Sequence, residues 1–191
     1  IIPGFYNNDS SKKCIGEDGT VVIHDNGRVV TTYNASDKLK HEASFVAPFE
    51  KEEYVQSLLG ALRTRSDTEN ALKKLLEYQN PDDPFILAPM KNKMRECGII
   101  AAVCDVVDGW AESSSDMVHA ALTFLHHVNM FNSRKDRPPL NHLLVLSRDD
   151  TMRTLVELLR TSENPEVRLE AAGTLRQLSQ HTLTFFRTDN G

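Results

Sequence analysis

A recurring pair of adjacent apolar residues constrains the fold of this chain more than any other feature of its sequence. Each of three segments carries an apolar pair, a polar break, and then a second pair of small or apolar residues. The pairs are Leu58-Leu59 with Ala71-Leu72, Val106-Val107 with Ala120-Ala121, and Leu158-Leu159 with Ala171-Ala172. The two pairs of a segment lie 13, 14 and 13 residues apart, and the unit recurs after 48 and then 52 residues. Such a period is typical of stacked helical repeats, in which each unit buries its apolar face against its neighbours.

From about Glu50 onward, apolar residues recur at the spacing of an α-helix, and we find no strand pattern after that point. Polar residues that favour helix starts precede several of these stripes: Asp67, the Ser113–Asp116 run, and Asn164 followed by Pro165. Gly98 follows a short helical stretch and is expected to end it. The sequence therefore predicts an all-α body.

The first part of the chain has a different pattern. Two runs rich in β-branched residues, Thr20–His24 and Arg28–Tyr33, flank Asn26-Gly27, which favours a type I′ turn. We expect a β-hairpin here and an irregular loop over the polar stretch Asn7 to Asp18. An isolated hairpin is marginal in water, so it must pack on the helical body, pair with another chain, or join strands elsewhere.

These patterns divide the chain into two predicted parts. Residues 1–47 form an N-terminal extension with the hairpin near 20–33, and residues 48–191 form a helical repeat domain. The chain opens with Ile1 rather than Met, so we expect it to be an excerpt of a longer protein.

Composition narrows the class of protein. The chain has 191 residues, with 22 Lys+Arg against 27 Asp+Glu and a formal net charge of −5, which argues against nucleic acid as a partner. No stretch approaches the roughly 18–20 apolar residues of a membrane span, so we expect no membrane insertion. Three cysteines at irregular spacing favour a reducing compartment over a disulfide framework, and hence a cytoplasmic location.

No group of residues matches a catalytic or metal-binding pattern. His119, His126 and His127 share one predicted helix but lack the i,i+4 spacing of zinc ligands, and no nucleophile elbow occurs. The carboxylate pairs Asp82-Asp83 and Asp149-Asp150 lie at predicted helix starts, where negative charge complements the helix dipole. We therefore predict no enzyme activity, no metal and no cofactor.

Two short basic clusters, Lys91–Arg95 and Arg134–Arg137, are not interleaved with aromatic residues as in single-strand binders. We interpret both as solvated surface.

The last repeat unit carries a family resemblance. Residues Thr154–Leu178 resemble helices two and three of an armadillo repeat, and Met94–Ile100 resembles the helix end, glycine and helix start of the preceding repeat. The resemblance to armadillo-like proteins covers roughly residues 50–180. It implies a right-handed α-α superhelix of about three repeats, whose third helices line a concave groove that binds a protein or peptide.

The groove positions depart from the best-known members of that family. Alignment on the small-residue pairs puts Glu77, His126 and Gln177 where the family has an asparagine ladder. The neighbouring tryptophan position then holds Lys73, Leu122 and Gly173. Because Glu77 can only accept hydrogen bonds, we expect a folded partner or a helix in the groove rather than an extended peptide.

The candidate partner-binding residues in the groove are Lys73, Glu77, His126, Arg176 and Gln177. If the hairpin assembles with another strand, the candidates are Val22, His24, Val29 and Thr31.

The resulting functional prediction is a non-enzymatic protein–protein interaction module, a scaffold or regulatory domain binding its partner in the groove. One alternative is an assembly adaptor that dimerises through the hairpin, giving a homodimer. Another is a nucleotide-exchange cofactor for the 70-kDa heat-shock chaperones, which rests on the fold class alone. Cytoskeletal, ciliary, trafficking and signalling roles are not separated by these residues.

Overall fold

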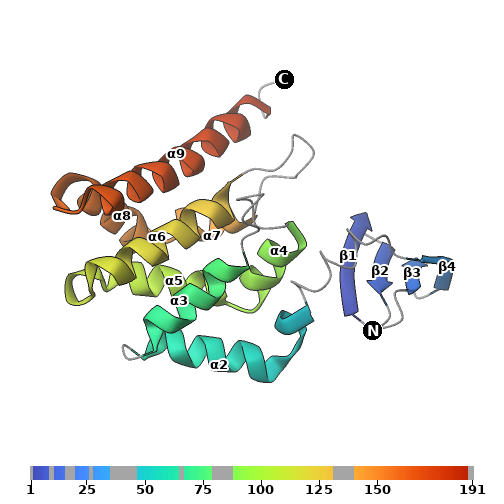
Figure 1. The fold of residues 1–191 in the computed structure, drawn as a ribbon. Coiled ribbons are helices and arrows are strands. Elements are labelled where there is room, and N and C mark those ends of the chain that lie inside the picture. Colours follow the sequence, from blue (N-terminus) through green and yellow to red (C-terminus); the bar gives the residue numbers. More distant parts are fainter. Residues whose placement is uncertain are drawn as a thin grey trace.

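The computed structural model describes residues 2–8, 11–15, 20–25, 28–34, 47–64, 67–78, 88–130 and 140–188. Within these ranges, side chains are described for residues 20–23, 28–29, 32–34, 47–64, 67–78, 90–130 and 141–180. Helices make up most of this part of the chain, as predicted, and an antiparallel sheet precedes them (Figure 1).

The N-terminal sheet has four strands in the order β1-β2-β3-β4. They are β1 (Ile2–Asn8), β2 (Ser11–Ile15), β3 (Thr20–Asp25) and β4 (Arg28–Asn34). The predicted hairpin corresponds to β3 and β4, whereas its turn at Asn26-Gly27 lies outside the described residues. β1 contacts the helical body at η1 and α4, and Figure 1 shows β4 at the far side of the sheet.

The expectation of a loop over Asn7 to Asp18 was wrong. Residues Ser11–Ile15 form β2, which pairs with β3 in an unbroken antiparallel register from Ser11↔Asp25 to Ile15↔Val21. Its first three residues, Ser11-Lys12-Lys13, have little strand propensity of their own. Its pairing with the β-branched strand β3 outweighs that propensity, because strand formation depends more on its neighbours than on the residue itself.

The helical body contains two 3-10 turns and eight α-helices within the described residues. Their bounds are η1 (Ala47–Glu50), α2 (Glu52–Arg63), α3 (Thr68–Glu77), α4 (Ala88–Glu96), α5 (Ile99–Asp108), η2 (Trp110–Glu112), α6 (Ser115–Asn129), α7 (Leu140–Leu146), α8 (Asp149–Thr161) and α9 (Pro165–Thr188).

Sequence signals at several helix ends are confirmed. Gly98 lies between α4 and α5 with a φ of +80°, a left-handed conformation that glycine adopts without strain. The Ser114 hydroxyl accepts a hydrogen bond from the Met117 amide at the start of α6. The Asn164 side chain accepts one from the Glu166 amide at 2.9 Å, with Pro165 as the first residue of α9.

The helices stack in rows, each helix packing against the corresponding helix of the next segment (Figure 1). α2 packs on α5 and α5 on α8, while α3 packs on α6 and α6 on α9; α4 contacts α7. Three buried alanines, Ala71 on α3, Ala121 on α6 and Ala171 on α9, follow one another at a spacing of 50 residues. The three segments identified from the sequence therefore share one continuous apolar core.

The interpretation of Lys91–Arg95 as solvated surface was wrong. The Lys91 side chain is only 7% exposed, and its ammonium donates to the backbone carbonyl of Met130 just beyond α6. Lys93 pairs with Glu50 at 3.0 Å. A cation at the C-terminal end of α6 satisfies an orphan carbonyl and complements the helix dipole, which explains why this lysine is buried. The clusters at Asp82-Asp83 and Arg134–Arg137 lie outside the described residues.

Candidate functional site

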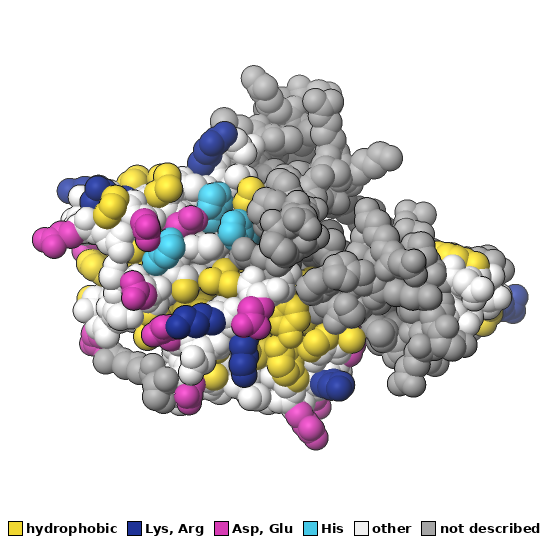
Figure 2. Space-filling model, viewed as in Figure 1, with side chains coloured by type: hydrophobic (Ala, Val, Ile, Leu, Met, Phe, Trp, Pro, Cys, Tyr) yellow, Lys and Arg dark blue, Asp and Glu magenta, His cyan; other side chains and the backbone are white. Residues whose placement is uncertain are grey.

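The last helix of each of the three segments is α3, α6 and α9, respectively. These three helices form one side of the helical stack, which we call the α3–α6–α9 face. Figure 2 shows histidine and charged side chains gathered over these helices. Lys73 and Glu77 lie exposed on α3, Arg176 is exposed on α9, and His126 and Gln177 are half-buried. The five groove candidates thus come from three helices that pack side by side.

Lys73 is paired within its own helix. Its ammonium donates to the Glu69 carboxylate at 2.6 Å, and that hydrogen bond raises the pKa of Lys73. Asp116, at the start of α6, raises the pKa in the same direction. The side chain is 63% exposed, so this pair is accessible to a partner and contributes little to stability.

His126 forms a contact between helices. Its Nδ1 lies 2.7 Å from a carboxylate oxygen of Glu170 on α9, and the two side chains are only 23% and 18% exposed. The hydrogen bond from His126 lowers the pKa of Glu170, although burial opposes this effect. Because an ionised carboxylate only accepts, Nδ1 carries the hydrogen. The His126 side chain therefore joins α6 to α9, with little of it left for a partner.

Gly173 makes this contact sterically feasible. A Cβ placed on Gly173 would come within 2.6 Å of the His126 ring, a distance that real Cβ atoms essentially never show. The absence of a side chain on α9 at this point lets the imidazole lie against the helix backbone.

His127 stacks on His126, with ring centroids 5.6 Å apart and an interplanar angle of 17°. Burial lowers the pKa of His127, and the neighbouring His126 and Lys91 lower it further, against an opposing effect of Glu170. Its Nδ1 is buried and has no hydrogen-bond partner among the described residues. His127 is accordingly neutral near pH 7.

The burial pattern of α6 favours an alignment shifted by one residue. Leu122, which the sequence alignment placed on the groove, is fully buried. Counting in steps of 50 residues from the buried alanines instead aligns Thr123 with Lys73 and Gly173, and His127 with Glu77 and Gln177. The two alignments differ because Ala120-Ala121 offers two small residues, of which only Ala121 is fully buried.

The assembly candidates lie on β3, an inner strand paired with both β2 and β4, and on β4, an edge strand of the sheet. Val29 is 59% exposed on β4 and Val22 is half-buried on β3, while the side chains of His24 and Thr31 are not among those that the structure describes. The register of β3 and β4 shifts between Ile23 and His24, so β4 contains a bulge. Bulges twist an edge strand and hinder its pairing with another chain.

A polar link that the sequence did not predict joins α5 to the start of α8. The Arg148 guanidinium bonds to Asp105 and lies 3.2 Å from Asp108, and the Thr151 hydroxyl donates to Asp108 at 3.0 Å. No local pattern signals these contacts, because the partners lie about 40 residues apart.

A second missed contact joins α7 to the end of α6. His142, which is 2% exposed, approaches the backbone carbonyl of Asn129 to 2.6 Å through Nε2. Together with Lys91, it satisfies carbonyls that the end of α6 would otherwise leave without partners.

The two cysteines whose side chains the structure describes, Cys97 and Cys104, are free thiols. Burial raises the pKa of Cys104 to about 12 and also raises that of Cys97, so neither is a ready thiolate nucleophile. Among the residues that the structure describes, no group of three His, Cys, Asp or Glu side chains is placed to hold a metal ion. In the same part of the chain, no helix has the length and apolarity to cross a membrane.

Comparison with known proteins bears on the last helical segment. The family model described as Armadillo/beta-catenin-like repeat matches residues 144–180, which span the end of α7, all of α8 and most of α9. No curated protein and no solved structure is significantly similar to the chain. The helical body of this chain therefore contains an armadillo-like repeat at residues 144–180.

Proposed function

We propose that the chain is a non-enzymatic protein-interaction module, a scaffold or regulatory domain that binds a protein partner on the α3–α6–α9 face. The observation that carries the proposal is the direct packing of α3 on α6 and α6 on α9, which joins the third helices into one surface. The armadillo-like repeat at 144–180 supports this assignment, because repeats that stack in this way create extended binding surfaces. We extend the armadillo-like description to all three segments, as a right-handed superhelix.

A folded surface or a helix fits this face better than an extended peptide. Backbone recognition needs side chains that can both donate and accept, and Glu77 only accepts. His126 is already committed to Glu170 at 2.7 Å. The exposed groups left on α3 and α9, including Lys73, Arg176 and part of Gln177, suit polar contacts to side chains of a partner.

The module is proposed to work in the reducing cytoplasm. The free thiols of Cys97 and Cys104 are compatible with that compartment, since reducing conditions keep cysteines unpaired.

Affinity capture from a native lysate with charge-reversal variants tests the proposal. Lys73→Glu disrupts the exposed pair with Glu69 on α3, and Arg153→Glu is its matched control, since it disrupts an exposed pair with Asp150 on α8. We expect proteins that the wild-type chain and Arg153→Glu both retain to be lost with Lys73→Glu, at an unchanged melting temperature. Equal retention by all three chains would place the interaction elsewhere.

A further inference from the structure

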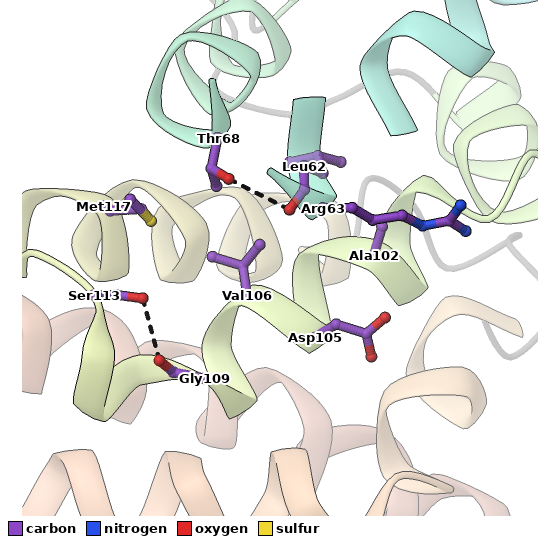
Figure 3. Close-up of a pocket in the computed structure, with 9 residues that line it drawn as sticks. All are labelled: Leu62, Arg63, Thr68, Ala102, Asp105, Val106, Gly109, Ser113 and Met117. Carbon is purple, nitrogen blue, oxygen red and sulfur yellow. Dashed lines mark hydrogen bonds between the residues drawn. The ribbon is translucent and has the colours of Figure 1, made fainter. Parts of the chain in front are cut away.

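A small cavity lies between α2 and α5, beside the first turns of α3 and α6 (Figure 3). Its volume is about 270 Å³. Leu62, Ala102, Val106 and Met117 provide apolar walls from three different helices. Pockets for drug-sized ligands measure roughly 300–1,000 Å³, so this one suits a single side chain rather than a cofactor.

The polar groups that line the cavity are already committed to protein partners. The Thr68 hydroxyl donates to carbonyls at the end of α2, including that of Thr64 at 2.8 Å. The Ser113 hydroxyl donates to the Gly109 carbonyl at 3.2 Å, and the Asp105 carboxylate bonds to Arg148. Figure 3 shows the first two of these side chains turned toward their backbone acceptors. A polar atom of a ligand would therefore find no free hydrogen-bond partner among these groups, and burying it without a partner would weaken binding.

Arg63 is different. It lines the cavity from the last turn of α2, it is exposed, and it makes no ion pair with any residue that the structure describes. Figure 3 shows its side chain passing beside Ala102, with the guanidinium directed away from Val106 and Met117. A guanidinium at the rim of an apolar cavity favours a carboxylate, which it can bind through two parallel hydrogen bonds.

We propose that this cavity is a second binding site, which takes a leucine-sized apolar side chain of a partner protein while Arg63 holds a carboxylate next to that side chain. The site is built from α2, α5 and the starts of α3 and α6. It does not use the groove candidates on the α3–α6–α9 face, so it stands or falls independently of the function proposed above.

Titration of the full chain, labelled with ¹³C at the methionine methyl groups, tests the proposal. The probe is N-acetyl-leucine, which carries both the apolar side chain and the carboxylate. We expect the Met117 methyl signal to shift, while the other four methionines serve as internal controls. N-acetyl-leucine amide, without the charge, should bind about two- to fivefold more weakly, and N-acetyl-glycine should not shift Met117.

Two variants complete the test. Arg63→Glu should weaken N-acetyl-leucine binding to at least the level of the neutral amide, and Arg160→Glu, an exposed arginine on α8, should leave it unchanged. Both arginines are exposed, so both variants should fold, which circular dichroism checks. A Met117 signal that does not respond overturns the proposal. So does equal binding of the acid and the amide, or full binding by Arg63→Glu.

Discussion

His126 on α6 and Glu170 on α9 share a hydrogen bond of 2.7 Å directly over Gly173, where α9 has no side chain. A polar pair and a glycine thus fix the distance between two helices whose remaining contacts are mainly apolar. The arrangement makes the junction between the second and third segments sensitive to substitutions that the sequence alone would not single out.

Gly173→Ala is expected to destabilise the fold. The added Cβ would meet the His126 ring at 2.6 Å, so the ring or α9 must move, at a cost of about 1–3 kcal/mol. Urea denaturation measures the loss. Gly60→Ala on α2 is the matched control, because nothing lies within 4 Å of its added Cβ. There the substitution should stabilise by about 0.4–1 kcal/mol through helix propensity. A neutral Gly173→Ala would contradict the close approach.

His126 and Glu170 should be energetically coupled. Replacing either one with alanine removes a charge-assisted hydrogen bond between two largely buried side chains, and we expect each to cost about 1–2 kcal/mol. A double-mutant cycle on the free energy of unfolding isolates the pair, with an expected coupling of roughly 1 kcal/mol. Additive effects of the two alanines would show that the pair contributes nothing beyond its separate contacts.

Stability should fall as the pH falls below about 6.5. Burial lowers the pKa of His127, so between its folded and unfolded pKa values the unfolded chain binds more protons than the folded chain. The lowered pKa of Glu170 acts in the same direction, but only below about pH 4.5. Unfolding free energies measured from pH 7.5 to pH 5 should therefore decline, and His127→Gln should flatten that decline. The same slope in His127→Gln as in wild type would exclude His127 as its source, and His119→Gln controls for loss of a histidine on this helix.

Lys91→Met should loosen the end of α6. The variant keeps most of the aliphatic stem but removes the ammonium that donates to Met130, and a carbonyl left without its partner costs about 1–3 kcal/mol. Hydrogen exchange of the last turn of α6 should accelerate. Lys93→Met is the control. It removes an ammonium that pairs with Glu50 and is more exposed than that of Lys91, so we expect it to accelerate exchange less. Equal protection of α6 in the two variants would argue against this role for Lys91.

The elements that the sequence predicts well are those with local signals. The stripe on α2, the left-handed glycine at Gly98 and the Asn164-Pro165 start of α9 depend on residues within one or two helical turns. The paired residues likewise indicated which sides of the helices are buried, because every pair has at least one buried member, although Leu159 in the third segment is exposed.

What escaped prediction depends on distant partners. Lys91 reads as a surface residue until α6 ends beside it, 39 residues later in the chain. β2 has the composition of a loop and becomes a strand through its neighbour β3. Of the groove candidates, His126 was placed by an alignment that could not distinguish Ala120 from Ala121, and only burial in the folded chain separates them.

The Arg148 link to Asp105 and Asp108 has a consequence for any attempt to shorten the chain. A truncation before α7 would remove the guanidinium and leave two neighbouring carboxylates on α5 without their counter-ion. The side of α5 that packs on α8 would then be exposed, with two unpaired carboxylates beside apolar side chains. A shortened chain that ends before α7 would therefore need substitutions at Asp105 and Asp108 on its newly exposed side.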